Sequence, residues 1–145
     1  MKIIAIASDH AGFELKEVLK KTIGSLGYKV LDLGANSTQQ VDYPDYGYKL
    51  ATAVSKGEAE FGVAICGSGI GISIAANRKP KVRAALCHNV EITKLARQHN
   101  NANVLALGAR IVSAELAKEI LTAFLATEFE GGRHESRVKK LGSRN

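Results

Sequence analysis

The sequence predicts an α/β protein with three layers, in which helices cover both faces of a five-stranded parallel sheet. Short apolar segments alternate with amphipathic segments along all 145 residues, which is the pattern of strands joined by helices. The apolar segments, such as Ile3–Ala7, are continuous runs, and continuous runs are typical of strands buried on both faces. No linker, repeat or low-complexity segment interrupts the alternation, so we expect residues 1–145 to form a single domain.

Each strand is expected where a short apolar run ends at glycine or at polar residues. The predicted strands cover residues 2–8, 28–33, 61–66, 82–87 and 104–107. The predicted helices follow them at residues 13–26, about 43–56, about 70–77, 91–98 and 114–126. Gly27 ends the first helix, and Pro44 suits the first turn of the second. A basic segment after Gly131 and Gly132 predicts a last helix at about 133–141.

The composition favours a compact, soluble, folded protein over a membrane, secreted or nucleic-acid-binding one. Apolar runs are far shorter than the ~20 residues that span a bilayer, and the apolar amino end meets Asp9 and His10 where a signal peptide would have small residues. We therefore expect a cytoplasmic protein in which both cysteines, Cys66 and Cys87, remain thiols. The net charge of +6 is spread along the chain, which argues against nucleic acid and suits a small anionic substrate.

Polar residues follow several of the predicted strands. Ligands of parallel sheets bind at the carboxyl ends of the strands, so these residues are the first candidates for a site. Asp9 and His10 follow the first strand, the segment Cys66–Gly71 follows the third, and Arg110 follows the fifth. The sequence therefore predicts a site at this edge of the sheet.

The segment Cys66-Gly67-Ser68-Gly69-Ile70-Gly71 joins a strand to a helix. Glycines at such a position let backbone N–H groups turn towards a bound anion, although a plain tight turn is the alternative. The segment fits neither the Walker loop nor the GxGxxG fingerprint. Cys66 is either a core thiol or a reactive one. The second interpretation rests on the helix that follows, because a helix amino terminus increases the thiolate fraction of a nearby cysteine. Cys87 has no glycine loop, and we expect it in the core.

The remaining candidates also admit two interpretations each. Asp9 and His10 suit proton transfer or phosphate recognition, but Asp9 also suits a turn. His99 closes a helix, where a charged imidazole complements the helix dipole. Arg133 and Arg137 are four residues apart, which predicts two guanidinium groups on one helix face, suited to a phosphate.

The alternative for the basic segment is a solvated tail. His134 and Lys140 are expected on its solvated face in either case.

Six ordered segments carry a resemblance to a known family: Ser8–Phe13, Asp42–Tyr46, Cys66–Asn77, Arg97–Asn100, Asn103–Arg110 and Glu130–Arg137. They resemble ribose-5-phosphate isomerase type B, whose wider family includes subunits of galactose-6-phosphate isomerase and an allose-6-phosphate isomerase. The resemblance implies interconversion of D-ribose 5-phosphate and D-ribulose 5-phosphate through a cis-enediol(ate), in the non-oxidative pentose phosphate pathway, without metal or cofactor. It also implies that the five-stranded parallel sheet is Rossmann-like, and that the protein is a homodimer or homotetramer with the site at the subunit interface.

The resemblance implies roles at the reacting carbons. Cys66 is the base that moves the proton between C2 and C1, Ser68 handles the proton on the substrate oxygen, and Asp9 is the polar partner of Ser68. Backbone amides of the loop stabilise the enediolate: those of Gly67, Ser68, Gly69, Ile70 and Gly71.

The resemblance also implies roles for the remainder of the substrate. His99 opens the furanose ring, while Asn100 and Tyr43 hold hydroxyl groups. The phosphate is expected to be bound by four basic residues: His10, Arg110, Arg133 and Arg137.

Two alternatives to this function stay open. In the first, the substrate is another sugar phosphate, namely allose 6-phosphate or galactose 6-phosphate. In the second, the chain binds a sugar phosphate but catalyses no reaction. Cys66 and His99 argue against pure binding, because binding alone has no use for a thiol at the loop. Cys66 and His10 together argue against a galactose-6-phosphate isomerase subunit.

Overall fold

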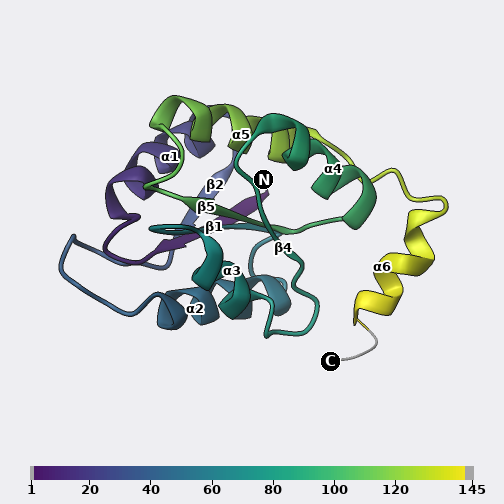
Figure 1. Ribbon diagram of the computed structural model, residues 1–145, viewed down its shortest axis with the longest axis horizontal. Helices are drawn as coiled ribbons and strands as arrows, with labels where there is room; N and C mark the ends of the chain where they lie inside the picture. The colour runs from purple at the N-terminus through teal and green to yellow at the C-terminus, as the bar shows by residue number, and fades with distance from the viewer. Residues whose placement is uncertain (1, 143–145) are drawn as a thin grey trace.

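Five parallel strands form the central layer of the protein, in the order β2-β1-β3-β5-β4 (Figure 1). The structure, a computed structural model, describes residues 2–142. The strands are β1 (Ile3–Ser8), β2 (Lys29–Asp32), β3 (Phe61–Cys66), β4 (Ala84–Leu86) and β5 (Val104–Gly108). Every pair of neighbours in the sheet is parallel.

Helices cover both faces of the sheet, which confirms the three-layer α/β class (Figure 1). One layer consists of α1 (Phe13–Ser25), α4 (Val90–Asn100) and α5 (Ala114–Ala126), and the other of α2 (Tyr43–Ser55) and α3 (Ile70–Ala76). Each layer buries its own apolar cluster against the sheet, with Phe124 in one and Leu50 in the other. None of the helices within residues 2–142 is long and apolar enough to cross a bilayer.

The strand order predicts a ligand-binding crevice between β1 and β3. The chain adds β2 on one side of β1 and then crosses to β3 on the other side, and such a reversal opens a ligand-binding crevice at the carboxyl ends of the strands. Because β5 lies beside β3, the residues that follow β5 also reach this crevice. The topology thus brings together the three strand ends that the sequence singles out.

Several boundaries differ from those predicted from the sequence. β4 covers only Ala84–Leu86. The backbone N–H of Arg83 donates to the side chain of Asn103, at 2.8 Å, and not to the backbone of a neighbouring strand. α4 is longer than predicted: the Asn89 side chain accepts from the N–H of Ile92 at its start. The last helix, α6, covers His134–Gly142 and lies apart from both helix layers, next to the end of α4 (Figure 1).

A buried lysine connects α1 to the end of β2. The Lys16 ammonium is almost completely inaccessible and lies 2.9 Å from Asp32 and 3.1 Å from Glu17. Asp32 also lies 2.8 Å from Lys20 and accepts a hydrogen bond from the N–H of Gly34. Burial of Asp32 opposes its ionisation, but hydrogen bonds from Lys20 and Lys16 outweigh burial and lower the pKa of the carboxyl group.

This ion-pair network predicts an asymmetric response to mutation. Asp32→Asn leaves the buried Lys16 ammonium with Glu17 as its remaining carboxylate, so we expect the free energy of unfolding to fall by about 3 kcal/mol. Lys16→Met removes the charge and keeps an apolar side chain, so the loss is expected to stay below about 1.5 kcal/mol. Urea denaturation measures both.

The pH dependence checks the assignment. The lowered pKa of Asp32 adds stability that is present above the pKa of an unfolded aspartate, about 3.9, and is lost as the pH falls from there through the folded pKa. Asp32→Asn should therefore lose less stability than the wild type on acidification, and an equal loss would contradict the network.

Candidate active site

Asp9 and Cys66 are neighbours at the crevice between β1 and β3. The sheet pairs Ser8 with Ile65, and the next residues, Asp9 and Cys66, follow directly; the N–H of Asp9 still donates to the carbonyl of Ile65, at 3.1 Å. The Asp9 carboxylate is buried and accepts from the N–H of Gly12 at 3.1 Å. Asp9 thus shapes the turn into α1, and within residues 2–142 no hydrogen bond joins it to Ser68.

The glycine loop holds its two reactive side chains by its own amides. The N–H of Gly69 donates to Cys66 Sγ, and the N–H of Ile70 donates to Ser68 Oγ, both at 3.2 Å. These two amides therefore orient the thiol and the hydroxyl, whereas the family resemblance assigns them to an enediolate. The amides of Gly67, Ser68 and Gly71 remain as candidates for that role. Gly69 directly precedes α3 and has a φ of +79°, a conformation that favours glycine.

Two further predicted residues surround the loop. The loop after β5 is attached to it because the N–H of Arg110 donates to the carbonyl of Gly67, at 3.0 Å. The Arg110 guanidinium then lies over Gly67, where a Cβ atom would come within 3.1 Å of Nη1. The ring of Tyr43 packs on Gly71 so closely that a Cβ there would overlap it. Backbone and side chain thus place a cation at Gly67 and a phenol at Gly71 of the loop.

His10 lies at the beginning of the turn that follows β1. Its Nδ1 lies 3.1 Å from the carbonyl oxygen and 3.2 Å from the backbone nitrogen of Val41, so the polar loop before α2 fixes the ring. The side chain is half-buried and belongs to the carboxyl edge. This edge therefore holds most of the predicted residues: Asp9, His10, Tyr43, Gly67, Ser68, Gly69, Ile70, Gly71, Cys66 and Arg110.

The other predicted residues lie at the opposite edge of the sheet. α4 starts after the carboxyl end of β4 and ends at Asn100, close to the start of β5. Its 11 residues carry the chain about 16 Å away from the crevice. His99 and Asn100 are at this far end, and α6 with Arg137 packs beside them. A single chain thus divides the predicted site into two groups, one at each edge.

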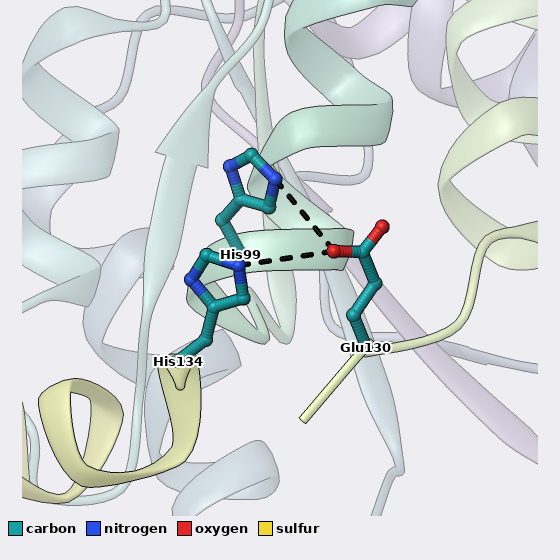
Figure 2. Close-up of side chains that lie close together, drawn as sticks. All are labelled: His99, Glu130 and His134. Atoms are coloured by element: carbon teal, nitrogen blue, oxygen red, sulfur yellow. Dashed lines mark ion pairs between the residues drawn. The ribbon is translucent and has the colours of Figure 1, made fainter. Parts of the chain in front are cut away.

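His99 packs against a residue that was expected to lie in solvent. The rings of His99 and His134 are stacked, with centroids 4.3 Å apart, and His134 is only 8% exposed (Figure 2). The prediction of a solvated His134 was wrong because α6 turns this residue onto the end of α4. Burial and the nearby charges of His99 and Arg133 lower the pKa of His134.

The two arginines of the tail lie at the start of α6 and within it. α6 begins at His134, so Arg133 directly precedes the helix and Arg137 lies inside it. Both residues are exposed. That both guanidinium groups share one face stays a prediction.

Comparison with known proteins identifies the family. A family model described as Ribose/Galactose Isomerase matches residues 4–141. The chain therefore belongs to the ribose/galactose isomerase family. It is 46% identical to ribose-5-phosphate isomerase B of Escherichia coli over 141 residues, which are 97% of this chain and 95% of that protein.

Solved structures of this isomerase family have the same fold. Ribose-5-phosphate isomerase B of Clostridium thermocellum superposes with a TM-score of 0.96 at 48% identity, covering 98% of this chain and 96% of the other. Ribose-5-phosphate isomerase B of Mycoplasma genitalium, solved with bound ribulose-5-phosphate, superposes with a TM-score of 0.92 at 41% identity, covering 96% and 93%.

The two cysteines of this family member have different surroundings. Cys87 is completely buried, as expected, in the cluster between the sheet and the α1, α4 and α5 layer. Burial raises the pKa of its thiol, although a hydrogen bond with Thr93 acts in the opposite direction. Cys87 is therefore a packing residue, and Cys66 is the thiol at the crevice.

One residue near His99 was not predicted from the sequence. Glu130 Oε1 lies 3.8 Å from His99 Nε2 and 3.7 Å from His134 Nε2 (Figure 2). The four-residue spacing of Glu130 and His134 is visible in the sequence, but their approach to His99 depends on tertiary packing.

The loop geometry predicts that Gly69 does not tolerate a side chain. In Gly69→Ala the new Cβ would lie 2.6 Å from Leu86 Cδ1 and 2.7 Å from the carbonyl carbon of Leu107, at a positive φ. We expect the free energy of unfolding to fall by about 2 kcal/mol or more and isomerase activity to fall with it, since this amide holds Cys66.

Gly24→Ala is the matched control. Gly24 lies near the end of α1, and a Cβ added there would meet no atom within 4 Å, so alanine should raise stability by about 0.5 kcal/mol. Equal effects of the two substitutions would show that the loop is not strained by a side chain at residue 69.

Proposed function

We propose that this protein interconverts D-ribose 5-phosphate and D-ribulose 5-phosphate through a cis-enediol(ate), without a metal or cofactor. The observation that carries the proposal is the Cys66 thiol at the crevice between β1 and β3, oriented by the Gly69 amide and lying in the loop that Arg110 covers. This arrangement offers a base, loop amides and a cation within one edge of the sheet. Membership of the ribose/galactose isomerase family supports the same reaction.

The reaction needs a group that moves one proton between adjacent carbons. Cys66, as thiolate, removes the proton from C2 of the open-chain aldose, and O1 gains a proton, which gives the enediol. Loss of the O2 proton and return of the sulfur-held proton to C1 then give the ketose. The Ser68 hydroxyl carries protons to and from the substrate oxygens. A positioned base contributes about 10²–10⁴ in rate, and each well-placed oxyanion donor about 2.7–4 kcal/mol.

The substrate requires residues from both edges of the sheet, so we propose a homodimer, or a homotetramer built from it. His99 would open the furanose ring, Asn100 and Tyr43 would hold hydroxyls, and Arg133 and Arg137 would bind the phosphate with His10 and Arg110. In this arrangement His99, Asn100, Arg133 and Arg137 come from a second copy.

An apolar surface beside the loop supports this assembly. Ile70, Ile74 and Ile111 are each more than half exposed, and Ile70 and Ile111 directly flank the glycine loop and Arg110. Exposed apolar side chains that cluster around a site are typical of a protein interface. A second copy seated there would bring its α4 end and α6 over the crevice.

A coupled assay with purified protein tests the substrate assignment. Ribose 5-phosphate should be converted faster than allose 6-phosphate or galactose 6-phosphate, with a chelator present throughout. A higher kcat/KM for either hexose phosphate would reassign the substrate, and loss of activity in chelator would contradict a metal-free reaction.

The role of Cys66 predicts a selective loss of activity. Cys66→Ala should lower kcat by about 10²–10⁴-fold, because the proton loses its acceptor, while circular dichroism shows an intact fold. Exchange of the carbon-bound proton with solvent deuterium should fall in parallel. Cys87→Ala, the control, should keep kcat. If Cys66→Ala retained near-normal turnover, the loop would be a binding device and Cys66 would not be the base.

The divided site predicts that two defective variants complement each other. Cys66→Ala and His99→Asn homodimers should both be impaired on ribose 5-phosphate, whereas a mixed dimer contains one intact site. Unfolding and refolding an equal mixture should therefore restore about a quarter of the wild-type activity. Activity no higher than that of the separate variants would place Cys66 and His99 in the same chain's site.

A further inference from the structure

Three metal-ligating side chains meet at the end of α4. His99, Glu130 and His134 place one ligand atom each so that all three atoms lie within 4.8 Å of one another. Within residues 2–142 this is the one group of three or more histidine, cysteine or acidic residues with such an arrangement. Figure 2 shows both imidazoles presenting a ring nitrogen to the same carboxylate oxygen.

The distances within this group exceed those of hydrogen bonds. Glu130 Oε1 lies 3.8 Å from His99 Nε2 and 3.7 Å from His134 Nε2, whereas a hydrogen bond would need about 3.2 Å or less. Ligand atoms around a tetrahedral ion with bonds of about 2.0–2.2 Å are roughly 3.3–3.5 Å apart. The two pairs that include Glu130 are thus a few tenths of an ångström from metal-binding distance, and the two imidazole nitrogens, which lie within 4.8 Å of each other, must approach as well.

Contacts around the three residues hold them in place. The N–H of Glu130 donates to the carbonyl of Gln98, at 3.1 Å, and ties its backbone to α4 beside His99. The N–H of His134 donates to the carbonyl of Gly131, also at 3.1 Å, at the start of α6. The two rings are stacked, with an interplanar angle of 15°, so one imidazole must rotate about its side-chain bonds before both nitrogens point at one ion. The backbone therefore holds the three side chains close together, and a ring rotation completes the geometry.

The donor set favours one class of ion. Two imidazoles and one carboxylate, with a fourth position open, are typical ligands of Zn²⁺ and related transition-metal ions, whereas Mg²⁺ and Ca²⁺ prefer oxygen ligands. Binding requires neutral imidazole, so it is expected to weaken as the pH falls. The exposed Glu130 and half-exposed His99 leave the group accessible from solvent.

We propose that His99, Glu130 and His134 bind a divalent transition-metal ion of the Zn²⁺ class, and that its binding inhibits the isomerase. Inhibition follows because the ion takes up a ring nitrogen of His99 and immobilises the imidazole that would move protons during ring opening. This second statement rests on the proposed function of His99, whereas the binding itself does not.

Titration of the full-length protein with Co²⁺ tests the site directly. One Co²⁺ per chain should give the visible absorption of a four- or five-coordinate ion, displaced by Zn²⁺, and without the near-ultraviolet band of a cobalt–thiolate bond. Glu130→Gln and His134→Asn should each weaken binding by about tenfold or more. The matched controls, Glu135→Gln and His88→Asn, should bind as the wild type does.

Two results would overturn the site: absence of stoichiometric Co²⁺ binding, or equal affinity in the wild type, Glu130→Gln and His134→Asn. A thiolate band would assign the ion to a cysteine instead and would also overturn it.

Isomerase assays test the inhibition separately. Zn²⁺ should lower the wild-type rate, a chelator should restore it, and His134→Asn should need about tenfold more Zn²⁺ for half-inhibition. Normal Co²⁺ binding together with an unchanged rate in Zn²⁺ would overturn the inhibitory role while the site stands. Absence of activity on every sugar phosphate would contradict the proposed function and leave the Co²⁺ result unaffected.

Discussion

The common direction of the five strands is the constraint on which the rest of the structure depends. In a parallel sheet every helix starts at the edge where a strand ends and finishes at the other edge, so residues after strands and residues at helix ends are separated by the length of the sheet. Cys66 is of the first kind and His99 of the second. The proposed reaction uses both, so under that proposal a second copy would supply His99.

Within the carboxyl edge, short backbone contacts do most of the positioning. Amides of the loop hold the Cys66 sulfur and the Ser68 hydroxyl, and the turn after β5 brings Arg110 over the same loop. The positions of these groups depend on glycines that let other segments of the chain approach closely, as at Gly71 under the Tyr43 ring. Both cysteines are buried in apolar clusters, but only the Cys66 sulfur accepts a hydrogen bond from the glycine loop, whereas Cys87 packs in the core.

The sequence predicted the sheet, its helices and the carboxyl-edge residues because these depend on local pattern: apolar runs, glycines after strands, and the rule that ligands bind at strand ends. It could not predict contacts made between distant segments. From its place in a basic segment, His134 was predicted to be solvated. Its burial depends on the contact between α6 and α4. The shortness of β4 likewise depends on the Asn103 side chain, which replaces a strand partner at Arg83.

The separation of Cys66 and His99 also has a consequence for how the rate depends on the amount of protein. If an isolated chain contains no complete site, then catalytic capacity follows mass action between copies and not the number of chains. Well above the dissociation constant of the dimer the rate is proportional to concentration, and well below it the rate falls with the square of concentration. In that case expression level and dilution change the activity per chain, because both change the fraction of chains that are paired.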